Sequence, residues 1–123
     1  KKNAQVFNGD AKTVIFNNNR NNVEGNLHWV AVSTTEILEG LMHWCMDHAI
    51  QSILVEGGAT TLKGFLSTDL WDECRVIEAK KCIKKGVKAP PIPEGEKTSK
   101  RIVGDVLRVI RNERHSVRNQ DIS

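Results

Sequence analysis

Residues 50 to 66 constrain the fold more than any other stretch of the chain, because they combine a strand, a tight turn and a helix in direct succession. Ser52 to Val55 is a short, partly β-branched apolar run, which is typical of a strand buried on both faces. A helix with one buried face is predicted after the turn from the i, i+3, i+4 spacing of Leu62, Phe65 and Leu66. The segment therefore predicts an α/β fold.

The turn in this segment is Glu56-Gly57-Gly58, followed by Thr60 and Thr61 at a plausible helix start. Free backbone N–H groups and the positive end of a helix dipole attract anions, so this layout suits a phosphate site. Neither the dinucleotide fingerprint nor the P-loop pattern is present, and Gly-Gly is also a common plain turn between a strand and a helix. A carboxylate that ends a buried strand needs a partner, which favours a ligand-facing Glu56.

Composition limits the class of protein. The chain has 123 residues, enough for one domain over residues 1 to 123, and 39% hydrophobic residues suffice for a modest core. The net charge of +3 suits a phosphorylated small molecule at least as well as nucleic acid. Aromatic residues make up 5% and Tyr is absent, which argues against a base-stacking surface.

The cysteines and the ends of the chain suggest where the protein works. Cys45, Cys74 and Cys82 are odd in number and lack CxxC spacing, so we expect free thiols in a reducing, cytoplasmic compartment. No apolar run approaches the roughly 20 residues of a membrane span, and no signal peptide is recognisable. The chain begins Lys-Lys without a Met, which suggests a fragment or a processed piece.

Further elements follow from local patterns. Strands are predicted at 13–16, 28–32 and 74–79, and an amphipathic helix at 35–48, with Ser33 and Glu36 at capping-box spacing before it. The helix between two strands predicts a right-handed parallel crossover. His43 and His48 are i, i+5 on different helix faces, so a shared metal ion is not expected and His48 suits the helix C-terminus.

Three polar or irregular stretches remain. The Asn-rich loop at 17–22 is interpreted as solvated, although a loop at a strand end is able to reach a ligand. Residues 80 to 99 form a long segment rich in Lys, Gly and Pro, of the kind that is usually functional or disordered. A terminal strand is predicted at 106–111, and the polar tail from about 110 to 123 is expected to fray.

Taken together, several motifs are familiar. They are Ser52-Ile53-Leu54-Val55-Glu56-Gly57-Gly58-Ala59-Thr60-Thr61-Leu62, Phe65-Leu66, Leu70-Trp71-Asp72-Glu73, Gly86-Val87-Lys88-Ala89-Pro90-Pro91 and Gly104-Asp105-Val106-Leu107. In this order they closely resemble the reductase domain of the bifunctional riboflavin-biosynthesis deaminase-reductase, which has the dihydrofolate-reductase-like fold. The resemblance runs from about Phe7 to Ile110.

The resemblance implies a chemistry and a site. The family uses NADPH to reduce the ribosyl group of 5-amino-6-(5-phosphoribosylamino)uracil to ribityl, with hydride going to C1 of the sugar. The resemblance implies that Glu56 contacts the substrate, a phosphorylated pyrimidine. The residues it implies for the cofactor are Gly57, Gly58, Ala59, Thr60, Thr61, Leu62, Lys63 and Gly64, with Asn17 as a further cofactor-facing position.

The chain also departs from the family pattern. A first strand with an Ala-x-Ser-Leu-Asp-Gly-like motif is missing, and so are the His-x-Glu and Cys-x-x-Cys patterns of the zinc deaminase half. We therefore expect the carboxyl-terminal part of a reductase domain, inactive alone. The alternative is a non-catalytic nucleotide-binding or assembly remnant of such a domain. A nucleic-acid-binding role for residues 80–88 lacks a recognition motif.

These observations predict a three-layer α/β fold with a mostly parallel mixed sheet flanked by helices, truncated at the N-terminus. The mostly parallel strands are predicted at 13–16, 28–32, 52–55 and 74–79. The last strand, 106–111, is predicted to be antiparallel, and the second helix is predicted near 59–67. Apolar surface and an unpaired strand edge predict a homo-oligomer, which the resemblance also implies.

Overall fold

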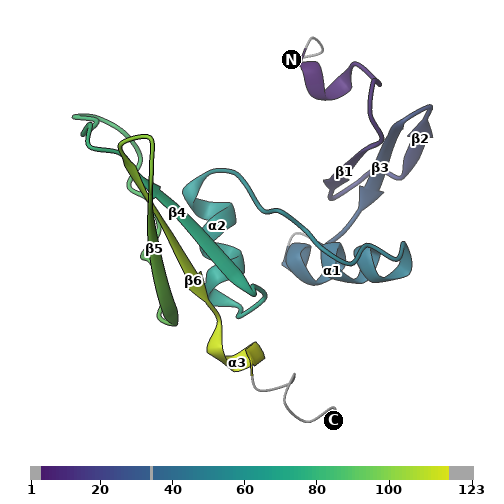
Figure 1. The fold of residues 1–123 in the computed structure, drawn as a ribbon. Helices are drawn as coiled ribbons and strands as arrows, with labels where there is room; N and C mark the ends of the chain where they lie inside the picture. Colours follow the sequence, from purple (N-terminus) through teal and green to yellow (C-terminus); the bar gives the residue numbers. More distant parts are fainter. Residues whose placement is uncertain (1–3, 34, 117–123) are drawn as a thin grey trace. The chain divides into compact units, whose positions relative to one another are not determined.

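The computed structural model describes residues 4–33 and 35–116 of the chain. Its internal contacts divide the protein into two compact units, Lys1–Leu54 and Val55–Ser123, and each is described by itself. Each unit contains one three-stranded sheet and one longer helix (Figure 1). Within the described ranges, no helix is both long and apolar enough to span a bilayer.

The first unit is a mixed sheet followed by a helix. Its strand order is β1-β3-β2, with β1 parallel to β3 and β2 antiparallel to β3. Gly25, at φ 58°, lies in the tight turn between β2 and β3, where glycine adopts this conformation without a steric cost. The elements are η1 (Gln5–Phe7), β1 (Thr13–Asn17), β2 (Asn22–Glu24), β3 (Leu27–Ala31) and α1 (Ile37–Asp47).

Close packing joins α1 to this sheet. The Phe16 ring of β1 meets the Trp44 ring of α1 edge-on, with 5.7 Å between ring centroids. A Cβ atom on Gly40 would lie 2.8 Å from Cγ1 of Val32, so the helix approaches the end of β3 more closely than a larger residue allows. Cys45, 7% exposed, is the buried hydrophobic residue of this helix.

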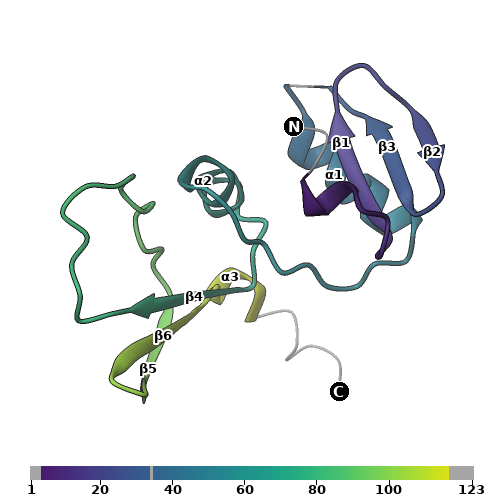
Figure 2. The same ribbon diagram turned by 90° about the horizontal axis from the view of Figure 1, so that it is seen from above.

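The second unit is an antiparallel sheet with a helix on one side of it (Figures 1 and 2). Its strand order is β4-β6-β5, and both pairs are antiparallel. Phe65 of the helix and Ile110 of the central strand are 7% and 0% exposed, which marks the small core. The elements are α2 (Ala59–Ser67), β4 (Glu73–Glu78), β5 (Glu96–Ile102), β6 (Asp105–Arg111) and α3 (Glu113–Ser116).

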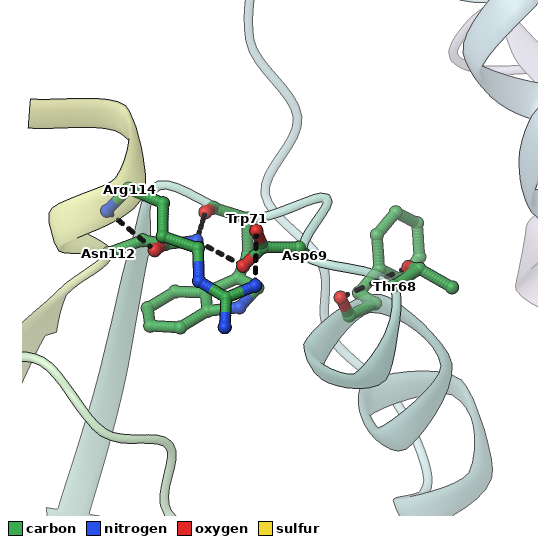
Figure 3. A network of polar contacts seen from close by, with 6 residues as sticks. Thr68, Asp69, Trp71, Asn112 and Arg114 are labelled. Carbon is green, nitrogen blue, oxygen red and sulfur yellow. Dashed lines mark hydrogen bonds and ion pairs between the residues drawn. The ribbon is translucent and has the colours of Figure 1, made fainter. Parts of the chain in front are cut away.

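A polar network ties the end of β6 to the turn between α2 and β4 (Figure 3). The Asn112 side chain, in a residue only 5% exposed, donates hydrogen bonds to Asp69 Oδ1 at 2.8 Å and to the Trp71 carbonyl at 3.0 Å. Its Oδ1 accepts from the Arg114 backbone N–H, and the Arg114 guanidinium lies 3.2 Å from Asp69 Oδ2. Every polar atom of this buried amide therefore has a partner, as burial requires.

Gly95 allows β5 to begin beside the end of β6. A Cβ atom at this position would lie 2.1 Å from the Arg111 carbonyl oxygen and 3.1 Å from Cγ2 of Ile110. The residue also has φ +151°, which L side chains rarely adopt. The return of the long loop 79–95 into the sheet thus depends on the absence of a side chain.

The predicted strand at 52–55 is wrong, because residues 50–56 form no helix or strand. Ile53 and Leu54 are 42% and 81% exposed rather than buried. A strand requires a neighbour for its backbone groups, and no described strand pairs with this run. The Gly57-Gly58 turn consequently follows an irregular connection and not a strand end.

The expectation of a mostly parallel sheet also differs from the structure. Among the described pairs, only β1 with β3 is parallel. The β5–β6 hairpin was not predicted, since residues 96–99 were included in the irregular segment. Its tight turn uses Val103 and Gly104, at φ 46° and 96°, and strands joined by so short a turn must be antiparallel. The three-layer arrangement stays a prediction.

The other predicted elements agree with the structure within one or two residues. Strands β1, β3, β4 and β6 and helices α1 and α2 lie where they were expected, and β6 is antiparallel to β4. The capping box is wrong: Glu36 is itself the N-cap of α1 and makes no side-chain cap. The prediction that the tail frays is wrong for residues up to 116, because Asn112 and α3 are part of the fold. Residues 117–123 lie outside the described residues.

Candidate functional site

The candidate site is the turn Glu56-Gly57-Gly58 and the first turn of α2. Gly57 has φ +148°, a conformation that favours glycine, and Gly58 is the N-cap of the helix at φ −71°, ψ 165°. Gly58 has no side chain with which to cap the helix, and the first turn contains no acidic residue. The sequence therefore leaves the amino end of α2 without a carboxylate of its own.

The backbone at this end presents hydrogen-bond donors. The Leu62 N–H donates to the Gly58 carbonyl at 3.2 Å and begins the hydrogen bonding of the helix. The N–H groups of the preceding residues, Ala59 to Thr61, have no carbonyl within the helix to receive them. A Cβ atom on Gly58 would meet nothing within 4 Å, so there is open space in front of the turn. Donors, dipole and space together suit an anion.

Glu56 is exposed at the start of this turn, and no hydrogen bond or ion pair joins its carboxylate to any residue within 4–33 or 35–116. Burial does not force a partner on this acid, because Glu56 and residues 50–54 before it are exposed. The carboxylate is instead available to accept hydrogen bonds from a ligand that binds beside the glycines.

The remaining residues predicted for the cofactor divide by exposure. Gly57, Gly58, Thr60, Thr61 and Lys63 are exposed, and Ala59, Leu62 and Gly64 are half-buried. The Gly64 carbonyl accepts hydrogen bonds from the hydroxyl groups of Ser67 and Thr68, at 3.1 and 2.9 Å. Gly64 thus belongs to the carboxyl-terminal half of α2, while the exposed residues cluster at its amino end.

Asn17 lies in the first unit, at the end of β1. Its amide nitrogen donates to the Arg20 and Val30 carbonyls at 2.9 and 3.2 Å, and its Oδ1 accepts from the Arg20 N–H at 2.7 Å. The side chain therefore fixes the loop between β1 and β2. A contact between Asn17 and a cofactor stays a prediction.

The first unit has a shallow pocket that sequence reasoning missed. It has a volume of about 300 Å³ and lies between the end of β3 and the amino end of α1. It is lined by Ala31, Val32, Ser33, Glu36, Glu39, Gly40 and His43. None of the predicted site residues lines it. Gly40, where α1 approaches Val32 closely, is among the lining residues, and no sequence motif signals such a contact.

Metal binding was not expected, and the described part of the chain contains no group of three or more His, Cys, Asp or Glu residues placed to hold an ion. His48 instead ends α1, as its position predicted. Its Nδ1 lies 2.8 Å from the Trp44 carbonyl oxygen, and its ring stacks on the Trp44 ring at 3.8 Å between centroids.

Comparison with known proteins adds one finding to this geometry. The family model described as the RibD C-terminal domain matches residues 1–119. No curated protein and no solved structure matches the chain. The match covers both units, and with them the Glu56-Gly57-Gly58 turn and Asn17.

Proposed function

Because the chain belongs to the RibD C-terminal domain family of riboflavin-biosynthesis reductase domains, we propose that it serves the NADPH-dependent reduction of 5-amino-6-(5-phosphoribosylamino)uracil. The ribosyl group of this phosphorylated pyrimidine becomes ribityl. The observation that carries the proposal is the turn at 56–61 within a chain-long family match. There Glu56, an acid with no partner among the described residues, precedes two glycines and a helix start that has no side-chain cap. The compartment we propose is the cytoplasm.

The residues of the turn have separate roles in this proposal. The N–H groups of Ala59 to Thr61 and the hydroxyl groups of Thr60 and Thr61 hold phosphate oxygens of the cofactor, because they are donors at the positive end of a helix dipole. The Glu56 carboxylate accepts hydrogen bonds from the substrate and orients it. NADPH, when bound, supplies the hydride that reduces C1 of the sugar.

The exposure of the turn bears on what the 123 residues do alone. Small-molecule sites enclose most of their ligand, about 70–90% of its surface. Glu56, Gly58 and Thr60 are all exposed, so the turn by itself covers only a small part of a dinucleotide. We expect weak NADPH binding and no turnover by the isolated chain. The same exposure favours a second candidate, a non-catalytic nucleotide-binding or assembly module.

We also propose that the protein forms a homo-oligomer. Strand β4 is an edge of its sheet, and Ile77 on it is 72% exposed. Exposed strand edges and apolar residues favour association with a partner. Light scattering tests this proposal, and a monomer at micromolar concentration contradicts it.

Gly58→Val tests the cofactor site. The position has an ordinary φ and open space around its Cβ, so the variant keeps its fold while the valine occupies the space in front of the N–H donors. We expect NADPH affinity to fall at least tenfold, about 1.4 kcal/mol, with a loss of stability of only about 1 kcal/mol, because valine is less favourable than glycine at an N-cap. Ser67→Val, at the other end of α2, is the matched control. Equal NADPH affinity in both variants refutes the assignment.

Turnover distinguishes the two candidate functions. The complete gene product is assayed for oxidation of NADPH with the phosphoribosylaminouracil as substrate. Reductase turnover that Glu56→Gln lowers supports the enzyme, whereas NADPH binding without any turnover supports the non-catalytic module.

A further inference from the structure

The loop 79–95 of the second unit concentrates positive charge. It contains five lysines within nine residues, and no acidic residue occurs between Glu78 and Glu94. This local charge exceeds the net charge of +3 of the whole chain. The lysines are Lys80, Lys81, Lys84, Lys85 and Lys88, which we call the lysine segment.

The charge of the lysine segment is not neutralised by its surroundings. All five lysines are exposed, and no ion pair joins any of them to a residue that the structure describes. Glu78, the nearest acid before the segment, pairs with Arg108 at 2.6 Å. An uncompensated group of exposed cations produces a field that extends about one Debye length, ~10 Å at 0.1 M salt.

The topology of the second unit places the start of the lysine segment at the same end of the unit as the candidate site. A short turn over residues 68–72 joins α2 to β4, so the carboxyl end of β4 lies at the same end of the unit as the amino end of α2 (Figures 1 and 2). Lys80 and Lys81 follow the last residue of β4 closely. The lysine segment therefore begins at the end of the unit where the turn at 56–61 presents its N–H donors.

We propose that the lysine segment steers phosphate-bearing ligands toward the turn at 56–61 and accelerates their association. The inference rests on the proposed function, since it assumes that the turn receives an anion. NADPH carries several negative charges, and a phosphoribosyl substrate carries about two on its phosphate at pH 7. Charge focusing of this kind raises association rates by about 10- to 1000-fold and weakens as ionic strength rises. Lysine suits this role because its ammonium is a compact, hydrated point charge.

Association kinetics test the proposal. The rate constants for NADPH association and dissociation are measured by stopped-flow fluorescence with the complete gene product, from 20 to 500 mM salt. K80E/K81E and K84E/K85E reverse charges in the segment. K97E/K100E makes the same change of net charge on the edge strand β5 and serves as the control. Circular dichroism confirms that each variant is folded.

We expect both segment variants to lose about tenfold in association rate at low salt, while the dissociation rate changes less than twofold. The loss shrinks at high salt, and the control changes the association rate less than threefold. If the control and the segment variants lose equally, net charge alone acts and the proposal is overturned. It is also overturned if the loss is entirely in the dissociation rate.

A second arm separates this proposal from the proposed function. Inorganic triphosphate is titrated into the isotope-labelled chain while the backbone amide resonances are observed. Shifts at both 57–61 and 80–88 that K80E/K81E weakens support steering of phosphate anions, even where NADPH itself does not bind. Absence of shifts in either region overturns the proposal. Tighter binding of single-stranded RNA than of triphosphate overturns it as well and identifies the segment as a nucleic-acid surface.

Discussion

The side chains of Asn112 and Asp69 are joined by a 2.8 Å hydrogen bond, although 43 residues separate them in the sequence. Asn112 → Ala breaks this bond and leaves the Trp71 carbonyl without its donor. We expect a loss of about 1–3 kcal/mol in the free energy of unfolding, measured by urea denaturation. Asn18→Ala, in the exposed loop of the first unit, is the control and changes stability by less than about 0.5 kcal/mol.

Gly95→Ala tests the return of the loop into the sheet. The new methyl group would lie 2.1 Å from a backbone oxygen, at a φ that alanine tolerates poorly. We expect a loss of about 2–3 kcal/mol in the free energy of unfolding. Gly86→Ala is the matched control, because its Cβ meets only Ile83, at 3.8 Å. Equal stability of the two variants would show that β5 begins differently.

The cysteines should react in an order set by burial. Burial raises the pKa of the Cys74 thiol, so its reactive thiolate is a smaller fraction at any given pH. We expect Cys82, which is exposed, to be alkylated first, and Cys74 to react appreciably only at higher pH. Mass spectrometry of iodoacetamide-treated protein between pH 7 and 10 measures this order. Faster alkylation of Cys74 than of Cys82 at pH 7 contradicts it.

The same shift has a consequence for stability. Because the folded state binds the Cys74 proton more tightly than the unfolded state, it is favoured while the thiol stays protonated. The stability that depends on the protonated Cys74 thiol is lost as pH rises from the ordinary thiol pKa through the raised pKa of the folded state. Cys74→Ser should therefore flatten the fall in stability on the alkaline side, which thermal unfolding across that range measures. An unchanged alkaline slope would be the contrary result.

Glu56→Gln keeps the shape of the acid and removes its charge. If this carboxylate orients the substrate, kcat/KM of the complete gene product falls about 10- to 100-fold, while the Kd of NADPH stays within a factor of two. The control is Glu39→Gln on α1, outside the predicted site. Wild-type turnover in Glu56→Gln would remove this residue from the substrate site.

Sequence patterns predicted the elements that local periodicity determines. The spacing of Leu62, Phe65 and Leu66 placed α2 within its observed bounds, and the apolar run at 13–16 gave β1. The candidate turn was found in the same way, since glycines before a helix are a local signal. Element type and position needed no long-range information in these cases.

Contacts between distant residues were not predictable in this way. The segment at 52–55 has the composition of a strand, but no described strand supplies backbone partners for it. Asn112 was expected to fray with the polar tail, because nothing in its neighbourhood reveals a partner at Asp69. The exposure of Glu56 was missed for the same reason, since burial depends on what packs against a segment.

The Val103-Gly104 turn affects how readily the β5–β6 hairpin closes. Hairpins with short loops form within about 1–10 μs, well before distant segments meet. Val103, a β-branched residue at φ 46°, must nevertheless enter a left-handed conformation for this turn to close. The hairpin therefore closes against a local conformational cost of about 1–3 kcal/mol, which comes from Val103, a side chain that is fully exposed and gains no packing in return.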